Sequence, residues 1–178
     1  MSDIHEQMDA YLEASLLPRD SQLRAALEAA QAADLPPIAV SPLLGEFLNM
    51  LVAIQGAARV LEIGTLGGYS TICMARALPP GGKLFSLELN PDCIRVATAN
   101  LVQSGMSDRV TILEGPAMET LTRFASRGEA PFDLFFIDAD KANIPGYVDG
   151  CLKLAHSGSL IVVDNVVREG AVLDAASE

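Results

Sequence analysis

The chain is poor in lysine and shows no cluster of positive charge. Its 178 residues include 23 acidic side chains against 12 of lysine and arginine, so the formal net charge is −11. Only Lys83, Lys141 and Lys153 are lysines. A protein that binds nucleic acid needs a basic face that neutralises phosphates. We therefore expect no nucleic-acid partner, and the acidity mainly favours solubility.

Long apolar runs and cysteine motifs are also missing. No apolar run has the length of a membrane span, and residues 1–6 do not begin a signal peptide. We therefore expect a cytoplasmic protein with no membrane partner. Cys73, Cys93 and Cys151 are widely spaced and form neither a zinc pattern nor a CxxC motif. Each lies in an apolar stretch, which predicts buried free thiols.

The remaining composition is that of a folded domain. Half of the residues are hydrophobic and 20% are charged, which is enough for a sizeable core. We expect a single domain over residues 1–178, with N-terminal helices over 1–57 and a core over 58–178. Apolar residues at helical spacing, interrupted by prolines, predict helices over Ile4–Leu17, over Ser21–Ala33 and from Ser41 to about Ile54.

From Arg59 onward, apolar runs alternate with segments of helix length. The predicted strands are Val60–Ile63, Leu84–Leu87, Val110–Leu113, Phe132–Ile137 and Ser159–Val163. The predicted helices are Gly68–Leu78, Pro91–Ser104, Ala117–Ser126 and Ile144–Ala155. This alternation predicts an α/β fold, a parallel sheet with helices on both faces. Several strands are continuously apolar, as expected when both faces are covered.

The segment Val60–Ser70 has the pattern of a strand, a tight turn and a helix start. Gly64 permits a sharp turn. A dinucleotide-binding fingerprint needs glycine where Leu66 stands, which argues against an NAD(P)-dependent oxidoreductase, and a P-loop is excluded because Gly-Lys-Ser/Thr is absent. A nucleoside-type site without provision for phosphates remains, and Glu62 would attract an ammonium or sulfonium. The alternative is a turn that needs glycine for geometry alone.

Glu88 ends the second predicted strand. In nucleoside-binding α/β folds, an acidic residue at this place accepts hydrogen bonds from the ribose hydroxyls. The alternative is a helix-capping or surface carboxylate. The joint presence of Glu62, Gly64 and Glu88 favours a binding site.

Asp138, Asp164 and Asn165 follow directly after predicted strands. The carboxyl ends of parallel strands face the ligand crevice, and oxygen ligands suit Mg²⁺, with Mn²⁺ or Ca²⁺ as alternatives. Lys141 would lie nearby and act as a general base, because a dication disfavours its charged form. Alternatively, the aspartates cap the following segments and the lysine is a solvated surface group. Asp140 is better interpreted as a helix cap.

Together, the segments Val60–Ser70, Gly115–Ala117, Asp138–Lys141 and Asp164–Val166 and the residue Glu88 resemble the cation-dependent O-methyltransferases. That family includes the caffeoyl-CoA and catechol O-methyltransferases and many bacterial relatives. The resemblance covers about residues 40 to 170 and implies a Rossmann-like methyltransferase fold that uses S-adenosylmethionine. It also implies a divalent cation, a small phenolic or catechol acceptor and a homodimer. A catalytically weak module that binds S-adenosylmethionine is the alternative.

The resemblance also implies roles for individual residues. The methionine part of the cofactor would be surrounded by Glu62, Gly64, Tyr69, Ser70 and the backbone of Thr65, the ribose held by Glu88, the adenine framed by Ala117 with Met118, and the metal held by Asp138, Asp164 and Asn165. Lys141 would be the base, and Asp138 would serve both cofactor binding and catalysis.

Three departures from the family pattern concern the acceptor pocket and the sheet edge. Relatives have tyrosine where Ile144 stands, although Tyr147 follows, and tryptophan where Arg168 stands. Our hypothesis is that Arg168 favours an acidic acceptor through charge-assisted hydrogen bonds; the alternative is a solvent-exposed arginine. Relatives also continue into a hairpin that finishes the sheet. Because residues 175–178 show no strand pattern, we expect this hairpin to be missing.

Overall fold

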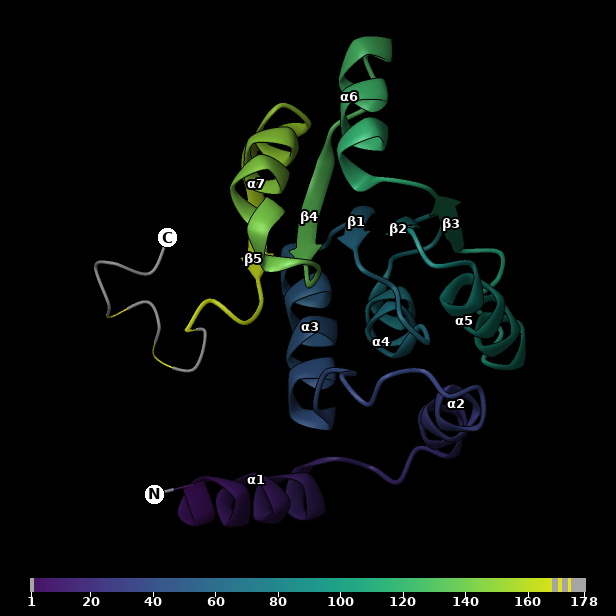
Figure 1. The fold of residues 1–178 in the computed structure, drawn as a ribbon, viewed down its shortest axis with the longest axis vertical. Helices are drawn as coiled ribbons and strands as arrows, with labels where there is room; N and C mark the ends of the chain where they lie inside the picture. Colours follow the sequence, from purple (N-terminus) through teal and green to yellow (C-terminus); the bar gives the residue numbers. More distant parts are fainter. Residues whose placement is uncertain (1, 168–169, 171–172, 174–178) are drawn as a thin grey trace.

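The computed structural model describes residues 2–167, 170 and 173, in which a parallel sheet lies between two layers of helices (Figure 1). The strands are β1 (Arg59–Ile63), β2 (Lys83–Glu88), β3 (Val110–Glu114), β4 (Phe132–Ile137) and β5 (Ala155–Val163). Their order is β3-β2-β1-β4-β5, and every neighbouring pair is parallel. The strand order reverses between β1 and β4, and ligands bind at such a switch point. The predicted fold class is confirmed.

The helices form one layer on each face of the sheet. On one face lie α3 (Pro42–Gln55), α4 (Tyr69–Ala77) and α5 (Pro91–Gln103), and on the other α6 (Ala117–Arg127) and α7 (Ile144–Leu152). The first two helices, α1 (Ser2–Leu16) and α2 (Ser21–Ala32), lie outside the α3–α5 layer at the bottom of Figure 1. A short 3₁₀ helix, η1 (Lys141–Asn143), precedes α7. The predicted elements agree closely with these bounds, except around α7 and β5.

The predicted end of the last helix and start of the last strand are wrong. The helix ends at Leu152, and β5 begins at Ala155 rather than at Ser159. Ala155 pairs with Phe132, after which the register shifts. The residues between Ala155 and Ser159 are polar except for Gly158, which has φ +98°. Their polarity indicates a loop, and only the pairing with β4 makes the segment part of the strand.

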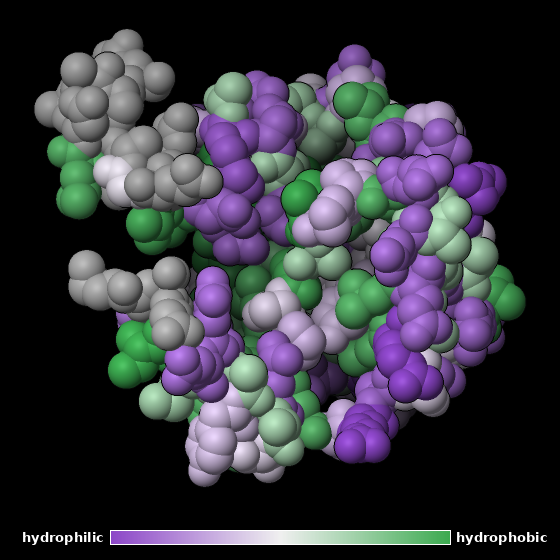
Figure 2. All heavy atoms as spheres, turned by 60° about the horizontal axis from the view of Figure 1, so that its bottom comes forward, coloured by the Kyte–Doolittle hydropathy of each residue, from purple (hydrophilic) through white to green (hydrophobic). Residues whose placement is uncertain are grey.

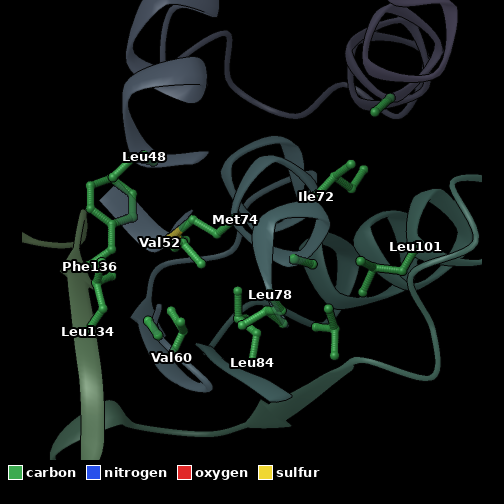
Figure 3. Packing of buried hydrophobic residues seen from close by; sticks show 14 residues of the cluster. Leu48, Val52, Val60, Ile72, Met74, Leu78, Leu84, Leu101, Leu134 and Phe136 are labelled. Carbon is green, nitrogen blue, oxygen red and sulfur yellow. The ribbon is translucent and has the colours of Figure 1, made fainter. Parts of the chain in front are cut away.

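Alternating side chains of the strands build two separate cores. Val60 and Leu61 are neighbours in β1 and both are fully buried. Val60 packs with Leu84 and with Val52 of α3 on the face drawn in Figure 3, whereas Leu61 belongs to the core under α6 and α7. Phe135 and Phe136 of β4 divide between the same two cores. This explains why the strands are apolar at consecutive positions.

Two predictions drawn from missing sequence features can be compared with the structure. Cys73, Cys93 and Cys151 are free and buried, as predicted. Burial raises the pKa of the Cys73 and Cys151 thiols to about 12, so neither is a reactive thiolate. Within the described residues, no helix is both long and apolar enough to span a membrane.

Several large apolar side chains of α1 and α3 are exposed, among them Ile4, Tyr11, Phe47 and Ile54. Figure 2 turns the lower side of Figure 1 forward and shows hydrophobic groups interspersed with hydrophilic ones. Scattered exposed apolar groups are ordinary on a protein surface. They do not identify a partner, and the homodimer stays a prediction.

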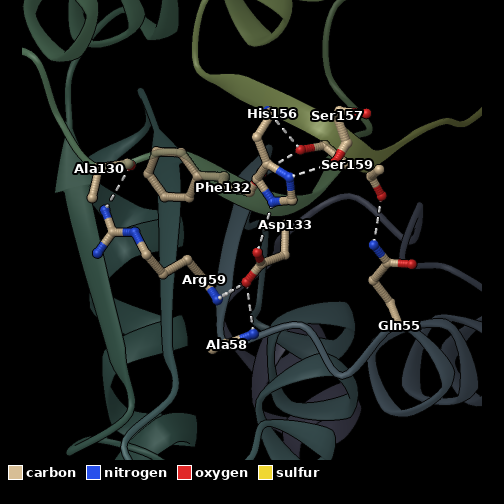
Figure 4. A network of polar contacts seen from close by, with 10 residues as sticks. Gln55, Ala58, Arg59, Ala130, Phe132, Asp133, His156, Ser157 and Ser159 are labelled. Atoms are coloured by element: carbon tan, nitrogen blue, oxygen red, sulfur yellow. Dashed lines mark hydrogen bonds and ion pairs between the residues drawn. The ribbon is translucent and has the colours of Figure 1, made fainter.

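The amino ends of the strands are tied together by a polar network (Figure 4). One carboxylate oxygen of Asp133 accepts hydrogen bonds from the backbone N–H groups of Ala58 and Arg59, both at 2.8 Å. Its other oxygen lies 2.9 Å from Nε2 of His156. The Arg59 guanidinium stacks over Phe132, 4.8 Å from the ring centre. Structural contacts therefore occupy the amino ends of the strands, and the predicted site lies at their carboxyl ends.

Candidate active site

The turn between β1 and α4 (the glycine turn) needs glycine because of its backbone conformation and because of a close contact with the residue after β4. Gly64 has φ +97°, and a Cβ atom there would overlap the carbonyl oxygen of Asp138. Gly68 has φ +83° and precedes the first residue of α4. Between them, Leu66 has φ +48°, in the left-handed region that favours glycine. A non-glycine residue there needs support from its surroundings.

Glu88 supplies part of that support. One of its carboxylate oxygens accepts hydrogen bonds from the backbone N–H groups of Thr65 and Leu66, both at 3.0 Å. The other accepts from Leu89 at 2.8 Å and from Asn90 at 2.9 Å. Glu88 thus clamps the glycine turn to the β2–α5 loop. The side chain that caps α5 is that of Asn90, so the capping alternative does not describe Glu88.

Glu62 is fully buried and bound by hydroxyl groups only. It accepts hydrogen bonds from Ser70 at 2.6 Å, Thr71 at 2.5 Å and Ser86 at 2.6 Å. The pKa of Glu62 is raised to about 7, mainly because of burial; the three hydroxyls oppose the rise and the charge of Asp138 adds to it. Ser70 lines the cavity described below and Glu62 does not. The predicted role of Glu62 in binding the cofactor stays a prediction.

The carboxyl ends of β4 and β5 bring the predicted metal residues together. Oδ1 of Asp138 lies 3.5 Å from Nζ of Lys141 and 3.4 Å from Nδ2 of Asn165. Burial raises the pKa of Asp138, and the charge of Asp164 raises it further, against the lowering effect of Lys141. Asn165 has φ +60°, and its N–H donates to Asp164 at 2.6 Å. The two carboxylates are thus close enough to repel each other.

This donor set fits a hard cation. A dication between Asp138 and Asp164 would offset their repulsion, and carboxylate and amide oxygens are the ligands that Mg²⁺ takes. Rotating the Asn165 amide would turn its oxygen toward Asp138, and the orientation of an amide is an assignment. Among the described residues, no three or more histidines, cysteines, aspartates or glutamates form a metal-binding group. The third protein ligand would therefore be the amide.

One cavity of about 870 Å³ connects these features. Besides the glycine turn and the ends of β4 and β5, the cavity has an apolar wall. This wall comes from α2 and the loop after it and includes Ala26, Ile38 and Val40. Of the predicted site residues, those on the cavity wall are Gly64, Thr65, Tyr69, Ser70, Glu88, Ala117, Asp138, Lys141 and Asn165, and those off it are Glu62 and Asp164. The glycine turn thus faces the same space as Asp138, Lys141 and Asn165.

The interpretation of Asp140 as a helix cap is wrong. Asp140 precedes η1, but its side chain makes no capping hydrogen bond. It accepts instead from the hydroxyl of Tyr147 at 2.5 Å and from Asn143 at 2.6 Å. All three side chains line the cavity. We call these contacts of Asp140 with Tyr147 and Asn143 the latch. The sequence offers no signal for the latch beyond the spacing of the three residues.

Asn100 of α5 was also not identified from the sequence. It is buried, and its amide nitrogen donates to the carbonyl of Gly67 at 2.8 Å and to that of Ala26 at 3.2 Å. It therefore holds α2 against the glycine turn. A single polar residue in a helix carries no pattern that reveals such a role.

Two expectations lie outside the described residues. They concern Arg168, which we expected beside the acceptor, and the C-terminal segment 175–178, where we expected the hairpin to be missing.

A doubly wound parallel sheet, with a glycine turn after β1 and an acidic residue ending β2, defines the Rossmann-like nucleoside-binding proteins. Comparison with known proteins narrows this class. The family model described as O-methyltransferase matches residues 13–178. The chain belongs to the O-methyltransferase family, as the sequence motifs indicated.

Individual relatives agree with this assignment. The chain is 49% identical to a catechol O-methyltransferase of Mycobacterium tuberculosis, over 93% of this chain and 74% of the relative. It is 43% identical to a catechol O-methyltransferase of Niastella koreensis, over 97% of this chain and 78% of the relative. The crystal structure of an O-methyltransferase from Bacillus cereus in complex with SAH superposes with a TM-score of 0.94 at 45% identity, covering 97% of this chain and 78% of that one.

Proposed function

We propose that this chain transfers a methyl group from S-adenosylmethionine to a hydroxyl of a small catechol-type acceptor, in a reaction that depends on a divalent cation, Mg²⁺. One observation carries the proposal. The cavity that Gly64 and Glu88 line is also lined by Asp138, Lys141 and Asn165. A nucleoside donor and a chelated acceptor would therefore meet in one cavity. The solved relative that binds SAH supports the donor, and the names of the curated relatives support the acceptor.

The donor would occupy the end formed by the glycine turn. The backbone there can approach a ligand closely, because Gly64 has no side chain. Glu88 would accept hydrogen bonds from the ribose while retaining its backbone clamp. The adenine would lie against Ala117 and Met118, which also line the cavity. The methionine part would lie beside Tyr69 and Ser70.

The acceptor would occupy the end formed by Asp138, Asp164 and Asn165. These three residues would hold the cation, which supplies charge that lowers the pKa of a nearby hydroxyl when bound. Lys141, 3.5 Å from Asp138, is placed to take the proton that the acceptor hydroxyl loses. The acceptor oxygen then attacks the methyl carbon in line, the bond from that carbon to sulfur breaks, and the thioether leaves. Positioning of the two reactants supplies much of the rate.

The test is a methylation assay on a simple catechol with S-adenosylmethionine, with Mg²⁺ or with EDTA. We expect product only with the metal, and a loss of at least about 100-fold in kcat/KM for Asp138→Asn, because a metal ligand and its charge are removed. Asp149→Asn is the matched control, since it makes the same chemical change on the exposed face of α7. Turnover that persists in EDTA would refute the metal dependence. Binding of S-adenosylmethionine without turnover, with or without metal, would favour the catalytically weak binding module.

A further inference from the structure

Glu62 is a buried carboxylate that the proposed reaction does not use directly. Its side chain has no exposed surface, and its three hydrogen-bond donors are the neutral hydroxyls of Ser70, Thr71 and Ser86. Within the described residues it has no cationic partner. Burying a carboxylate costs several kcal/mol unless a charge compensates it. An explanation is needed for why an uncompensated carboxylate stands at this place.

Glu88 and Asp138, two carboxylates of the cavity, are compensated in ways that Glu62 is not. Glu88 accepts four backbone N–H groups. Asp138 lies beside Lys141, and a bound cation would compensate the charge of Asp138. Asp140 also has only neutral donors, but its side chain is open to solvent. Glu62 is fully buried, and it stands directly behind Ser70, which lines the donor end of the cavity.

We infer that Glu62 selects the positively charged sulfonium form of the methyl donor over its neutral thioether product, acting through space from behind the wall formed by Ser70. The inference rests on the proposed function. S-adenosylmethionine and S-adenosylhomocysteine share the adenosine, the ammonium and the carboxylate and differ at sulfur by a methyl group and one positive charge. A cation opposite a buried carboxylate gains from the low dielectric, whereas a thioether gains nothing. Preference for the substrate would also promote release of the product after transfer.

Glu62→Gln separates charge from geometry. The amide has the size of the carboxyl group, and Ser70, Thr71 and Ser86 can each donate to its oxygen or accept from its nitrogen. Ser86 also exchanges a hydrogen bond with Thr65 at 2.6 Å in which either atom can donate, so the network can reverse direction. The variant therefore keeps a satisfied buried cluster while the charge is lost.

The experiment measures Kd by calorimetry for three ligands: S-adenosylmethionine, S-adenosylhomocysteine and sinefungin, which carries an ammonium in place of the sulfonium. Titrations at about pH 8 lie above the pKa of about 7 that burial gives Glu62. We expect Glu62→Gln to weaken the two cationic ligands by about tenfold and the thioether by less than about twofold, as for loss of a nearby opposite charge. Glu6→Gln, the same change on exposed α1, should alter none of them. Each titration is repeated with Mg²⁺ and with EDTA, and the difference between the ligands should persist in both.

The outcomes are separable. Equal weakening of all three ligands by Glu62→Gln would show a merely structural role and overturn the inference, as would no change at all. If the wild-type chain binds none of the three, the proposed function fails as well. If the variant does not fold, the wild-type protein tests the inference instead. The ratio of its Kd values for S-adenosylmethionine and S-adenosylhomocysteine is then compared at low salt and at about 1 M NaCl. A buried charge is poorly screened, so the ratio should persist, and its collapse at high salt would assign the preference to exposed groups.

Discussion

The backbone of Gly64 lies against the backbone of Asp138, so that a Cβ atom on residue 64 would be 3.0 Å from the carbonyl carbon of Asp138 and would overlap its oxygen. The glycine turn of the donor end and the first carboxylate of the metal end are therefore in direct contact. The contact follows from the pairing of β1 with β4, whose last pair is Ile63 with Ile137. Any change that separates the two backbones disturbs both ends of the cavity together.

Gly64→Ala should destabilise the protein by about 3 kcal/mol or more, since the left-handed conformation and the overlap each cost about 1–3 kcal/mol. Gly105→Ala is the matched control, because Gly105 also has positive φ, +72°, but nothing lies near the position of its Cβ. It should cost only about 1–2 kcal/mol. The measurement is the urea midpoint of each variant. Equal losses would show that backbone conformation alone, without the contact to Asp138, requires glycine.

Asn100→Leu should weaken the binding of S-adenosylmethionine as well as the fold. The substitution leaves the carbonyls of Gly67 and Ala26 without their shared donor, at a cost of about 2 kcal/mol. It also frees α2 from the turn that faces the cavity. Asn49→Leu removes a comparable bond, from Asn49 to the carbonyl of Cys73 at 2.8 Å, away from the cavity. We expect both variants to lose stability in urea and only Asn100→Leu to raise the Kd. An unchanged Kd would refute the link between α2 and the donor site.

Tyr147→Phe should lower kcat about 3- to 10-fold while changing stability by only about 1 kcal/mol, the value of one hydrogen bond to a carboxylate that is partly open to solvent. The hydroxyl of Tyr147 holds Asp140, which is one residue before Lys141. Loss of the bond would leave the proposed base less well positioned. Tyr11→Phe makes the same change on an exposed side chain of α1 and should be silent. If kcat is unaffected by Tyr147→Phe, the latch does not position Lys141.

The network at the amino edge of the sheet predicts a pH-dependent stability. The hydrogen bond that the His156 ring donates to Asp133 raises the pKa of His156 above 6.5. That contribution is complete below 6.5 and disappears as the pH rises through the folded-state pKa. Burial tends to raise the pKa of Asp133, but the hydrogen bonds from His156 and from the N–H groups of Arg59 and Ala58 outweigh it and lower the pKa below 3.8. Its contribution is complete above 3.8 and disappears as the pH falls further.

The pair should therefore stabilise the fold most between these two values. The difference in urea midpoint between the wild type and His156→Gln should be larger at about pH 5.5 than at about pH 8.5. His5→Gln, which alters the other histidine of the chain, should show no such difference. A difference that grows toward alkaline pH would contradict the assigned partner.

Local patterns in the sequence were sufficient for the class of fold and for several polar residues of the cavity wall. Alternating apolar runs and helical segments predicted the parallel sheet, because a strand buried on both faces is apolar throughout. Residues at strand ends, such as Glu88 and Asp138, were predicted to share a crevice, because parallel strands all end at one edge. The register shift between β4 and β5 and the early start of β5 at Ala155 were not predicted, because strand pairing is not a local property of polar residues.

The tertiary structure decided what each polar side chain contacts. Glu62 and Ser70 were predicted to share one role, yet the packing of α4 on β1 buries the first behind the second. Asp140 was predicted as a cap, yet the return of α7 brings Tyr147 to it. Asn100 carried no signal until α2 was placed beside the turn. Residue type and spacing determine which groups reach the crevice, but hydrogen-bond partners depend on distances of a few ångströms between elements far apart in the chain, and only packing determines these.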